Sequence, residues 1–403
     1  MSWVWDSVSK NISENTAEWI IGGIVFGILG WILKQTWAVI KTWWQRRRAF
    51  LKEIEHLEGV TAELDGRIQR TLNAVGKSGD GGNGREGQGL WLTTPIQQPP
   101  SYFMFQSGQC IPIWVFANLK GGVAKTTNAV NLAAHYACRG ERVLLIDLDY
   151  QASASSMGLR DTVRIPTAGQ SSRATRLIDG QYKPHDLLDD AWAPTIGNDG
   201  MNQVANFRLI PSAYDLARAE NRLMVEWLLG AIQDDIRYTL AHLLHHEETQ
   251  ASFDRIVIDA PPRLTSACVQ ALCASTHVVI PTVLDKLSVE AVQTFVDQVK
   301  LLKSGGICPH IGFGAVVGYQ SGRSARQIPD AEELIFKTLR DADLSQELYK
   351  SGEAIPNNAL LAESAGSMIA YLRSDKPQET EGVRSIYSAL AQSIEDRISN
   401  HAS

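Results

Sequence analysis

The hydrophobic pattern changes three times along the chain of 403 residues. Residues 19–33 are all apolar or glycine, and apolar positions continue beyond Lys34 as far as Ile40. Residues 45–75 have apolar positions three and four apart, the period of a helix. Further on, short apolar runs alternate with helical patterns. The pattern predicts four segments: a transmembrane anchor at 1–44, a helical or coiled-coil stalk at 45–75, a Gly- and Pro-rich linker at 76–109 and an α/β domain at 110–403.

The apolar run predicts an anchor because, counted to Ile40, it reaches the about 17–25 helical residues that a bilayer core needs. Seven of the eleven Trp residues lie in the first 44 positions, and Trp favours membrane interfaces. Basic residues follow at positions 41, 46, 47, 48 and 52, so the positive-inside rule places the C-terminal side in the cytoplasm. A helix lying in the plane of the interface is the alternative, although residues 19–33 lack the polar face that it needs.

The stalk pattern is carried by Ile54, Leu57, Thr61, Leu64, Ile68 and Leu72. It favours a short coiled coil or a helix packed on a partner, and packing on the chain's own α/β domain is the alternative. Gly makes up half of residues 76–89, which is typical of a flexible linker. Pro95, Pro99 and Pro100 predict an extended lead-in to the α/β domain.

Composition narrows the function classes. The formal net charge of −6 argues against a general nucleic-acid footprint, so nucleic acid is allowed as a partner but not favoured. Arg323 and Arg326 are the candidates for a local basic patch. The five Cys residues are odd in number and contain no Cys-x-x-Cys pair, which favours a reducing compartment. His242, His245 and His246 are interpreted as a packed or exposed helix face rather than a metal site.

A strand, a glycine-containing loop and a helix follow one another at the start of the α/β domain. The apolar run at 111–117 predicts the strand, and Lys-Gly-Gly-Val-Ala-Lys-Thr-Thr at 120–127 forms the loop. The helical pattern after it ends at Gly140. A phosphate-binding loop requires this order of elements.

The residue types of the loop suit a nucleotide. Gly121 and Gly122 let backbone amides turn towards a phosphate without a Cβ clash. The start of the following helix adds free N–H groups and the positive end of its dipole. Lys125 can reach phosphate oxygens, and the Thr126 hydroxyl can bind Mg²⁺. The sequence therefore predicts ATP and Mg²⁺ as ligands.

Loop 120–127 resembles the deviant Walker A motif, Lys-Gly-Gly-x-x-Lys-[Ser/Thr]-Thr, of the ParA/MinD family of P-loop ATPases. Leu119 and Ala124 stand where the standard phosphate loop has glycine, and Ala124 would strain a left-handed backbone. Later segments resemble the family in the expected order, namely VLLIDLDYQ at 143–151, LIPSAYDLARAENR at 209–222, FDRIVIDAPP at 253–262 and the strand at 278–281. Tyr150 replaces a usual Pro, and the match weakens beyond residue 310. The resemblance implies a P-loop NTPase fold with a mostly parallel sheet flanked by helices.

The resemblance also implies a role for each motif residue. Nucleotide contacts fall to Lys120, Gly121, Gly122, Val123, Ala124, Lys125, Thr126 and Thr127. The catalytic residues would be Lys120, which acts across a dimer, Lys125 on the phosphates, and Asp149, which positions or activates water. Thr126 and Asp259 would hold Mg²⁺, the latter through water. Asp147, Asp149 and Asp259 each end an apolar strand, where open α/β sheets bind ligands.

The resulting hypothesis is a membrane-anchored ATPase at the inner membrane of a bacterium, with the ATPase domain in the cytoplasm. Residues 19–40 would contact lipid, two copies would dimerise through bound ATP, and the dimer would position or regulate an unidentified protein partner. Three alternatives stay open. They are a DNA-partitioning ATPase, a tyrosine kinase of the envelope-polysaccharide type, and a regulatory subunit of a phage-defence system.

Overall fold

The computed structural model describes residues 88–92, 110–159, 171–196, 202–320 and 327–401, together with twelve isolated positions before residue 70. The chain divides into two units, 1–70 and 71–403. No helix among the described residues is long and apolar enough to cross a membrane. The expected anchor at 19–40 lies outside them, apart from Gly27, Lys34 and Trp37. The expected stalk at 45–75 is described at seven positions, all of them helical and exposed.

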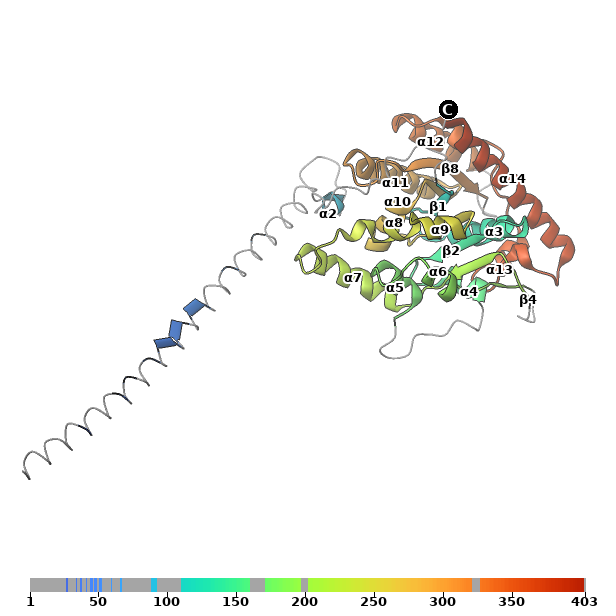
Figure 1. Cartoon of the computed structure of the whole chain (residues 1–403). Coiled ribbons are helices and arrows are strands. Elements are labelled where there is room, and N and C mark those ends of the chain that lie inside the picture. The colour runs from blue at the N-terminus through green and yellow to red at the C-terminus, as the bar shows by residue number, and fades with distance from the viewer. Residues whose placement is uncertain are drawn as a thin grey trace, which may run out of the picture. The chain divides into compact units, whose positions relative to one another are not determined.

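Six parallel strands form the sheet of the second unit, in the order β5-β2-β6-β1-β7-β8 (Figure 1). They are β1 (Ile113–Phe116), β2 (Val143–Asp147), β5 (Phe207–Ile210), β6 (Arg255–Asp259), β7 (His277–Val283) and β8 (Gly312–Tyr319). A small antiparallel pair consists of β3 (Thr195–Ile196) and β4 (Asn202–Gln203). The expectation of a mostly parallel sheet is confirmed.

Helices cover both faces of this sheet (Figure 1). One face carries α3 (Lys125–Cys138), α4 (Ser153–Leu159), α13 (Ala359–Ser364) and α14 (Pro377–His401). The other carries α5 (Arg173–Ile178), α7 (Asp215–Leu228), α8 (Thr239–Leu244), α10 (Ser266–Ala274), α11 (Lys286–Ser304) and α12 (Ile328–Asp341). Short helices complete the described parts: α2 (Gln88–Trp91), α6 (Asp186–Asp190), α9 (Glu247–Ser252), η3 (Ile236–Tyr238), η4 (Gln346–Leu348) and η5 (Ala370–Leu372).

The central strand β1 shows why short apolar runs predicted the sheet. Ile113 and Val115 belong to the hydrophobic core on one face, whereas Trp114 and Phe116 belong to the core on the other. All four side chains are at most 2% exposed. A strand covered on both faces needs apolar residues at every position, so it has no polar alternation.

The C-terminal helix α14 faces the core. Val383, Tyr387 and Ile394 are fully buried in the core on the face of the sheet that α3 also covers. The Tyr387 hydroxyl donates a hydrogen bond to Asn128 Oδ1 at 3.0 Å. The helix therefore supports α3 close to the loop at 120–127.

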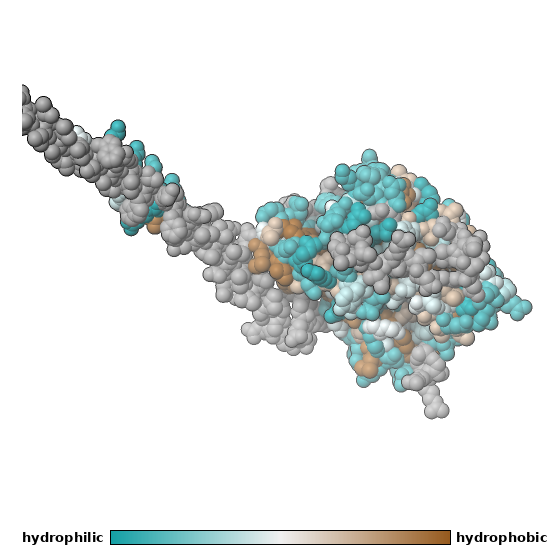
Figure 2. All heavy atoms as spheres, turned by 90° about the horizontal axis from the view of Figure 1, so that it is seen from below, coloured by the Kyte–Doolittle hydropathy of each residue, from teal (hydrophilic) through white to brown (hydrophobic). Residues whose placement is uncertain are grey.

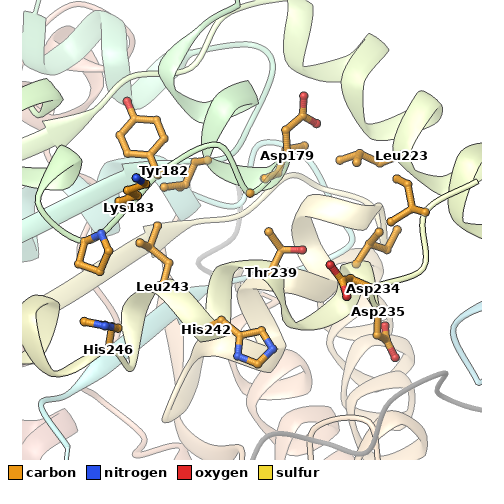
Figure 3. Close-up of a pocket in the computed structure, with 16 residues that line it drawn as sticks. Asp179, Tyr182, Lys183, Leu223, Asp234, Asp235, Thr239, His242, Leu243 and His246 are labelled. Atoms are coloured by element: carbon orange, nitrogen blue, oxygen red, sulfur yellow. The ribbon is translucent and has the colours of Figure 1, made fainter.

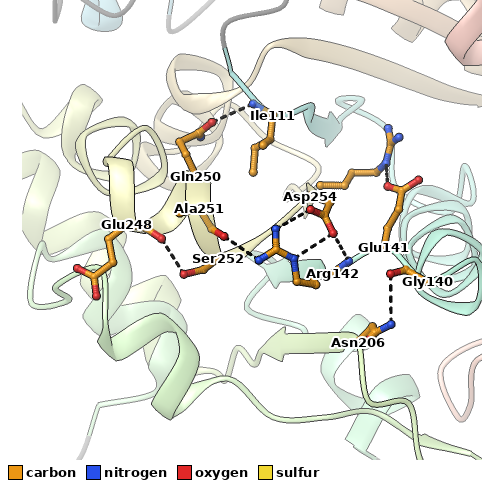
Figure 4. Close-up of polar contacts among 11 residues, drawn as sticks. Ile111, Gly140, Glu141, Arg142, Asn206, Glu248, Gln250, Ala251, Ser252 and Asp254 are labelled. Carbon is orange, nitrogen blue, oxygen red and sulfur yellow. Dashed lines mark hydrogen bonds and ion pairs between the residues drawn. The ribbon is translucent and has the colours of Figure 1, made fainter.

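A polar cluster joins the segments that enter β2 and β6 (Figure 4). The Arg142 guanidinium binds both carboxylate oxygens of Asp254, at 2.6 Å from Nη2 and 3.1 Å from Nε. The same guanidinium donates to the Ala251 carbonyl at 2.7 Å. These contacts lie before the strands begin, so they fix the edge of the sheet away from the carboxyl ends of the strands.

Of the expected linker at 76–109, the structure describes residues 88–92, where it has the helix α2. The Trp91 side chain is only 2% exposed and stacks on Trp227, with ring centroids 6.3 Å apart. The high Gly and Pro content around it predicted a linker. One aromatic side chain overrides that local tendency because it finds a buried partner.

Hydrophilic atoms dominate the face of the molecule that Figure 2 shows, with hydrophobic atoms in small groups. Among the described residues of the second unit, the large exposed hydrophobic side chains are Leu188, Tyr214, Val225, Leu229 and Leu287. Single hydrophobic side chains of this kind are ordinary on a protein surface.

Candidate functional site

The loop between β1 and α3 is held at its start by Asn118. This side chain is 1% exposed, donates from Nδ2 to the Pro281 carbonyl at 2.8 Å and accepts from the Lys120 amide at 3.1 Å. Pro281 lies on the neighbouring strand β7. The loop is therefore anchored to the carboxyl ends of two adjacent strands, where parallel sheets bind ligands.

Two residues of the loop adopt a left-handed backbone. Gly122 has φ of 72°, and Ala124 has φ of 63° and ψ of 25°. Nothing lies within 4 Å of the Cβ positions that Gly121 and Gly122 would carry. The loop backbone thus leaves open space, which a phosphate group requires. Ala124 is strained because its Cβ occupies this left-handed conformation, as the alanine at this position predicts.

Lys125, the first residue of α3, folds back over the loop. Its Nζ donates to the Lys120 carbonyl at 2.8 Å, and the residue is 7% exposed. Burial lowers the pKa of Lys125, and the carboxylates of Asp259 and Asp149 oppose this effect. A bound phosphate would supply further negative charge to this buried ammonium group.

Thr126 and Asp259, to which the resemblance assigns Mg²⁺, lie in contact. The Thr126 hydroxyl donates to Asp259 Oδ2 at 2.7 Å, and Asp259 is fully buried. Asp259 Oδ1 has no hydrogen-bond partner. Burial, followed by the neighbouring Asp147, raises the pKa of Asp259 well above its ordinary value.

These two residues fit a magnesium ion. A buried carboxylate oxygen without a donor, beside a hydroxyl oxygen, offers the hard oxygen ligands that Mg²⁺ prefers. Thr126 would hold the ion directly, and Asp259 would hold it directly or through water. When bound, the ion supplies positive charge next to the phosphates.

Asp147 and Asp149 differ in their surroundings. Asp147 is fully buried and accepts hydrogen bonds from the amide and hydroxyl of Ser155, at 2.8 and 2.7 Å, and from the Asp149 amide at 3.1 Å. Burial is the main cause that raises the pKa of Asp147 to about 6. Asp149 instead lines a cavity beside the loop. Asp147 therefore shapes the turn after β2, and Asp149 is the carboxylate of the two that faces the cavity.

Lys120 points to the rim of the site. Its Nζ donates to Ser288 Oγ at 2.8 Å and lies 3.6 Å from Asp285 Oδ1. Asp285 and Ser288 form the N-terminal turn of α11, where Asp285 caps the helix. The side chains of Lys120 and Asp285 are about one-third exposed, at 34% and 32%.

A cavity of about 550 Å³ joins most of the predicted residues. Gly121, Gly122, Ala124, Lys125, Thr126, Thr127 and Asp149 line it. The Val123 side chain is 1% exposed and buried, so only the backbone of this residue suits a phosphate. The sequence missed the rest of the lining, which consists of Gln151, Ser153, Met157, Pro262, Val283, Tyr319, Leu361, Ala362, Ala365 and Gly366. Tyr319 and the segment 361–366 lie beyond residue 310, in a part of the chain that carries no family motif.

Two of the candidate histidines, His245 and His246, make hydrogen bonds to the backbone. His245 Nε2 lies 2.9 Å from the Ala274 carbonyl, and His246 caps α9 by accepting from the Glu248 amide. The described residues contain no group of three or more His, Cys, Asp or Glu that could hold a metal ion. Arg323 and Arg326 lie outside the described residues.

A second cavity, of about 490 Å³, lies among α5, α7 and α8. Figure 3 shows Asp234 and Asp235 at one end of it, with Tyr182 and Lys183 at the other. It lies apart from the phosphate loop and shares no lining residue with the first cavity.

The fold and the first cavity define a P-loop nucleotide-binding protein. Residues 111–307 match the family model described as an AAA domain. The chain is 30% identical over 253 residues to the sporulation initiation inhibitor protein Soj of Bacillus subtilis, covering 62% of this chain and 87% of Soj. It is 32% identical over 257 residues to the chromosome-partitioning ATPase Soj of Thermus thermophilus, covering 63% and 85%. The chain belongs to the ParA/MinD family of P-loop ATPases.

Two solved structures share the fold. Apo McdA of Cyanothece aligns with a TM-score of 0.51 and 21% identity, over 68% of this chain and 98% of McdA. The pNOB8 ParA bound to nonspecific DNA aligns with a TM-score of 0.51 and 19% identity, over 72% of this chain and 99% of that protein. These two structures show the α/β fold, and membership of the P-loop ATPase family makes the protein an ATPase whose ligands are ATP and Mg²⁺.

Proposed function

We propose that this ATPase is anchored in the inner membrane of a bacterium and dimerises through bound ATP to position or regulate a protein partner there. It would hydrolyse ATP slowly, in its cytoplasmic domain, and act as a switch. The apolar run at 19–40 and the basic residues that follow it support the anchor. Trp37 and Trp44, which are 69% and 50% exposed, are side chains that suit a membrane interface.

The position of Lys120 carries the dimer proposal. Its ammonium group binds Ser288 and Asp285 at the rim, and Lys120 is not among the residues that line the nucleotide cavity of its own chain. A lysine at the rim of one copy can reach phosphates held by a second copy that faces it. The contacts to Asp285 and Ser288 would break in that state, and phosphate oxygens would replace them.

The decisive experiment uses the full-length protein in detergent. In an Asp149→Ala background that slows hydrolysis, Mg-ATP should convert the protein into dimers, measured by size exclusion with light scattering. Adding Lys120→Ala should leave it monomeric. In the otherwise native chain, Lys120→Ala should lower ATPase activity by roughly 10²-fold, the effect of losing one charge-stabilising group in an active site.

Lys286→Ala is the matched control, because Lys286 is an exposed lysine on the first turn of α11, the turn that Lys120 contacts. It should dimerise and hydrolyse ATP as the native chain does. Full ATPase activity in the Lys120→Ala variant would refute the proposed role of this lysine.

DNA partitioning is the second candidate, because one relative is named a chromosome-partitioning ATPase and one similar structure is a ParA bound to nonspecific DNA. The net charge of −6 weighs against it. Salt-sensitive binding to nonspecific duplex DNA would support this role. A tyrosine kinase is disfavoured because the tail tyrosines Tyr371 and Tyr387 are buried, at 7% and 0% exposure.

A further inference from the structure

Residues 88–92, here called the strap, dock on the ATPase domain through Trp91. The indole ring stacks on Trp227 with an interplanar angle of 16°, and its Nε1 donates to the Leu264 carbonyl at 3.0 Å. The side chain is 2% exposed. A buried indole with a paired N–H combines a large apolar contact with a directional one. The strap is thus fixed to a defined place.

A buried ion pair prepares the place where Trp91 docks. Arg237 Nη1 donates to the Trp91 carbonyl at 2.8 Å. Asp235 accepts from Nε and Nη2 of the same guanidinium at 2.8 and 2.5 Å, and both side chains are at most 1% exposed. The guanidinium also lies 5.0 Å from the Trp227 ring. A buried guanidinium needs its donors paired, so the strap completes this cluster.

Gly305 provides the space for the next strap residue. A Cβ on Gly305 would lie 2.7 Å from Leu92 Cδ2, its nearest neighbour, and 3.1 Å from the Leu301 carbonyl oxygen of α11. The backbone of Gly305 has φ of −74°, which any residue can adopt. This glycine is therefore suited to the docked strap rather than required by its own conformation.

The strap contacts a loop that leads from the nucleotide site. Leu264 belongs to the segment 260–265, which connects Asp259 at the end of β6 to the first turn of α10. Pro262 in this segment lines the nucleotide cavity. Just beyond this segment, Glu220 of α7 accepts a hydrogen bond from the Ala267 amide in the first turn of α10, at 3.3 Å. The segment 260–265 is thus bordered by the nucleotide cavity, by α7 and by the strap.

We propose that the strap positions the segment 260–265 and that Trp91 is a positioning residue for ATP hydrolysis. The strap connects the ATPase domain to the N-terminal part of the chain, so docking links that part to the nucleotide site. Coupling is reciprocal: a nucleotide that favours one position of the segment also changes how tightly the strap docks. This inference rests on the ATPase activity and is independent of the membrane anchor and of the dimer.

Trp91→Phe in the full-length protein tests it, because phenylalanine keeps an aromatic ring but leaves the Leu264 carbonyl without its donor. We expect kcat to fall about fivefold with an unchanged KM for ATP, which corresponds to the about 1 kcal/mol of one hydrogen bond. Amide hydrogen exchange should become faster at 260–267. In the native chain, a non-hydrolysable ATP analogue with Mg²⁺ should change exchange at 88–92.

Two further variants separate positioning from stability. Gly305→Val removes the space for Leu92 and should also lower kcat and speed exchange at 260–267, although residue 305 lies outside that segment. Trp192→Phe is the control, because Trp192 is a half-buried tryptophan that stacks under Arg173 instead. If Trp91→Phe and Gly305→Val lower Tm but leave kcat and exchange at 260–267 at the control's values, the strap only stabilises the fold and the proposal is wrong. Unchanged exchange at 88–92 with the nucleotide analogue would also overturn it.

Discussion

Ala124 carries a side chain in a backbone conformation that glycine adopts at lower cost. Its φ of 63° lies in the left-handed region, where an L-residue with a Cβ loses roughly 1–2 kcal/mol. Glycine relieves that strain but adds entropy to the unfolded chain. We predict that Ala124→Gly raises the free energy of unfolding by about 0.5–1 kcal/mol. Urea denaturation of the nucleotide-free protein measures the difference.

Ala389→Gly is the control for that prediction. Ala389 is an exposed residue in the middle of α14, where glycine should lower the free energy of unfolding by about 1 kcal/mol. The two variants should therefore shift in opposite directions. A loss of stability in Ala124→Gly would show that the left-handed alanine carries no strain.

His277 makes stability depend on pH. Burial, followed by the positive Lys303, lowers the pKa of His277 to about 4 from its ordinary value of 6.5. At this residue the unfolded chain therefore binds more protons than the folded chain between pH 6.5 and pH 4, so the contribution of His277 to stability is full above this window and is lost as pH falls through it. The shift corresponds to a contribution on the order of 3 kcal/mol. We predict that His277→Gln flattens this acid limb in denaturation curves.

The exposed His185 provides the comparison, since its side chain is 57% exposed. His185→Gln should keep the slope of the native protein between pH 6.5 and pH 4. An unchanged slope in His277→Gln would mean that other groups cause the loss of stability in acid.

At the scale of elements, Arg255 joins strand β6 to two helices. Its guanidinium lies 3.6 Å from the Tyr136 ring and 4.5 Å from the Trp114 ring. It also pairs with Glu141 at 2.9 Å and with Glu395 of α14 at 3.0 Å. The arginine side chain is 8% exposed, whereas its partners are 31% and 33% exposed. We predict that Arg255→Ala lowers the free energy of unfolding by about 2–3 kcal/mol, somewhat less than a fully buried pair would cost.

Arg142→Ala tests whether burial or the number of bonds decides this cost. Arg142 makes several bonds to Asp254 and Ala251 (Figure 4), yet the side chains of the pair are 49% and 42% exposed. Solvent screens such a pair, so the loss should stay below about 1 kcal/mol. Thermal unfolding of both variants under one condition gives the comparison. A larger loss in Arg142→Ala than in Arg255→Ala would reverse the expected order.

Burial also explains which elements the sequence could predict. Strands such as β1 and β6 are buried on both faces, so their apolar runs are visible without a partner. The pair of Thr126 and Asp259 was predictable because each residue sits in a recognisable motif. Trp91 was not, because its partners Trp227 and Leu264 lie far away in the sequence and only the fold brings them together. Tyr319 reaches the nucleotide cavity in the same way.

At the scale of the whole molecule, the proposed anchor at 19–40 makes a prediction that distinguishes spanning from surface binding. A lysine in the middle of a spanning helix costs about 2.5–3.5 kcal/mol, so the double variant Ile24→Lys/Ile28→Lys should not insert. We expect the native full-length protein to float with vesicles of bacterial lipids and to stay with them after an alkaline carbonate wash, while the double variant stays in solution. Leu51→Lys, at a position 52% exposed and beyond the run, should float like the native protein. A native protein that carbonate releases would instead lie on the membrane surface, and one that never floats would not be anchored by this run.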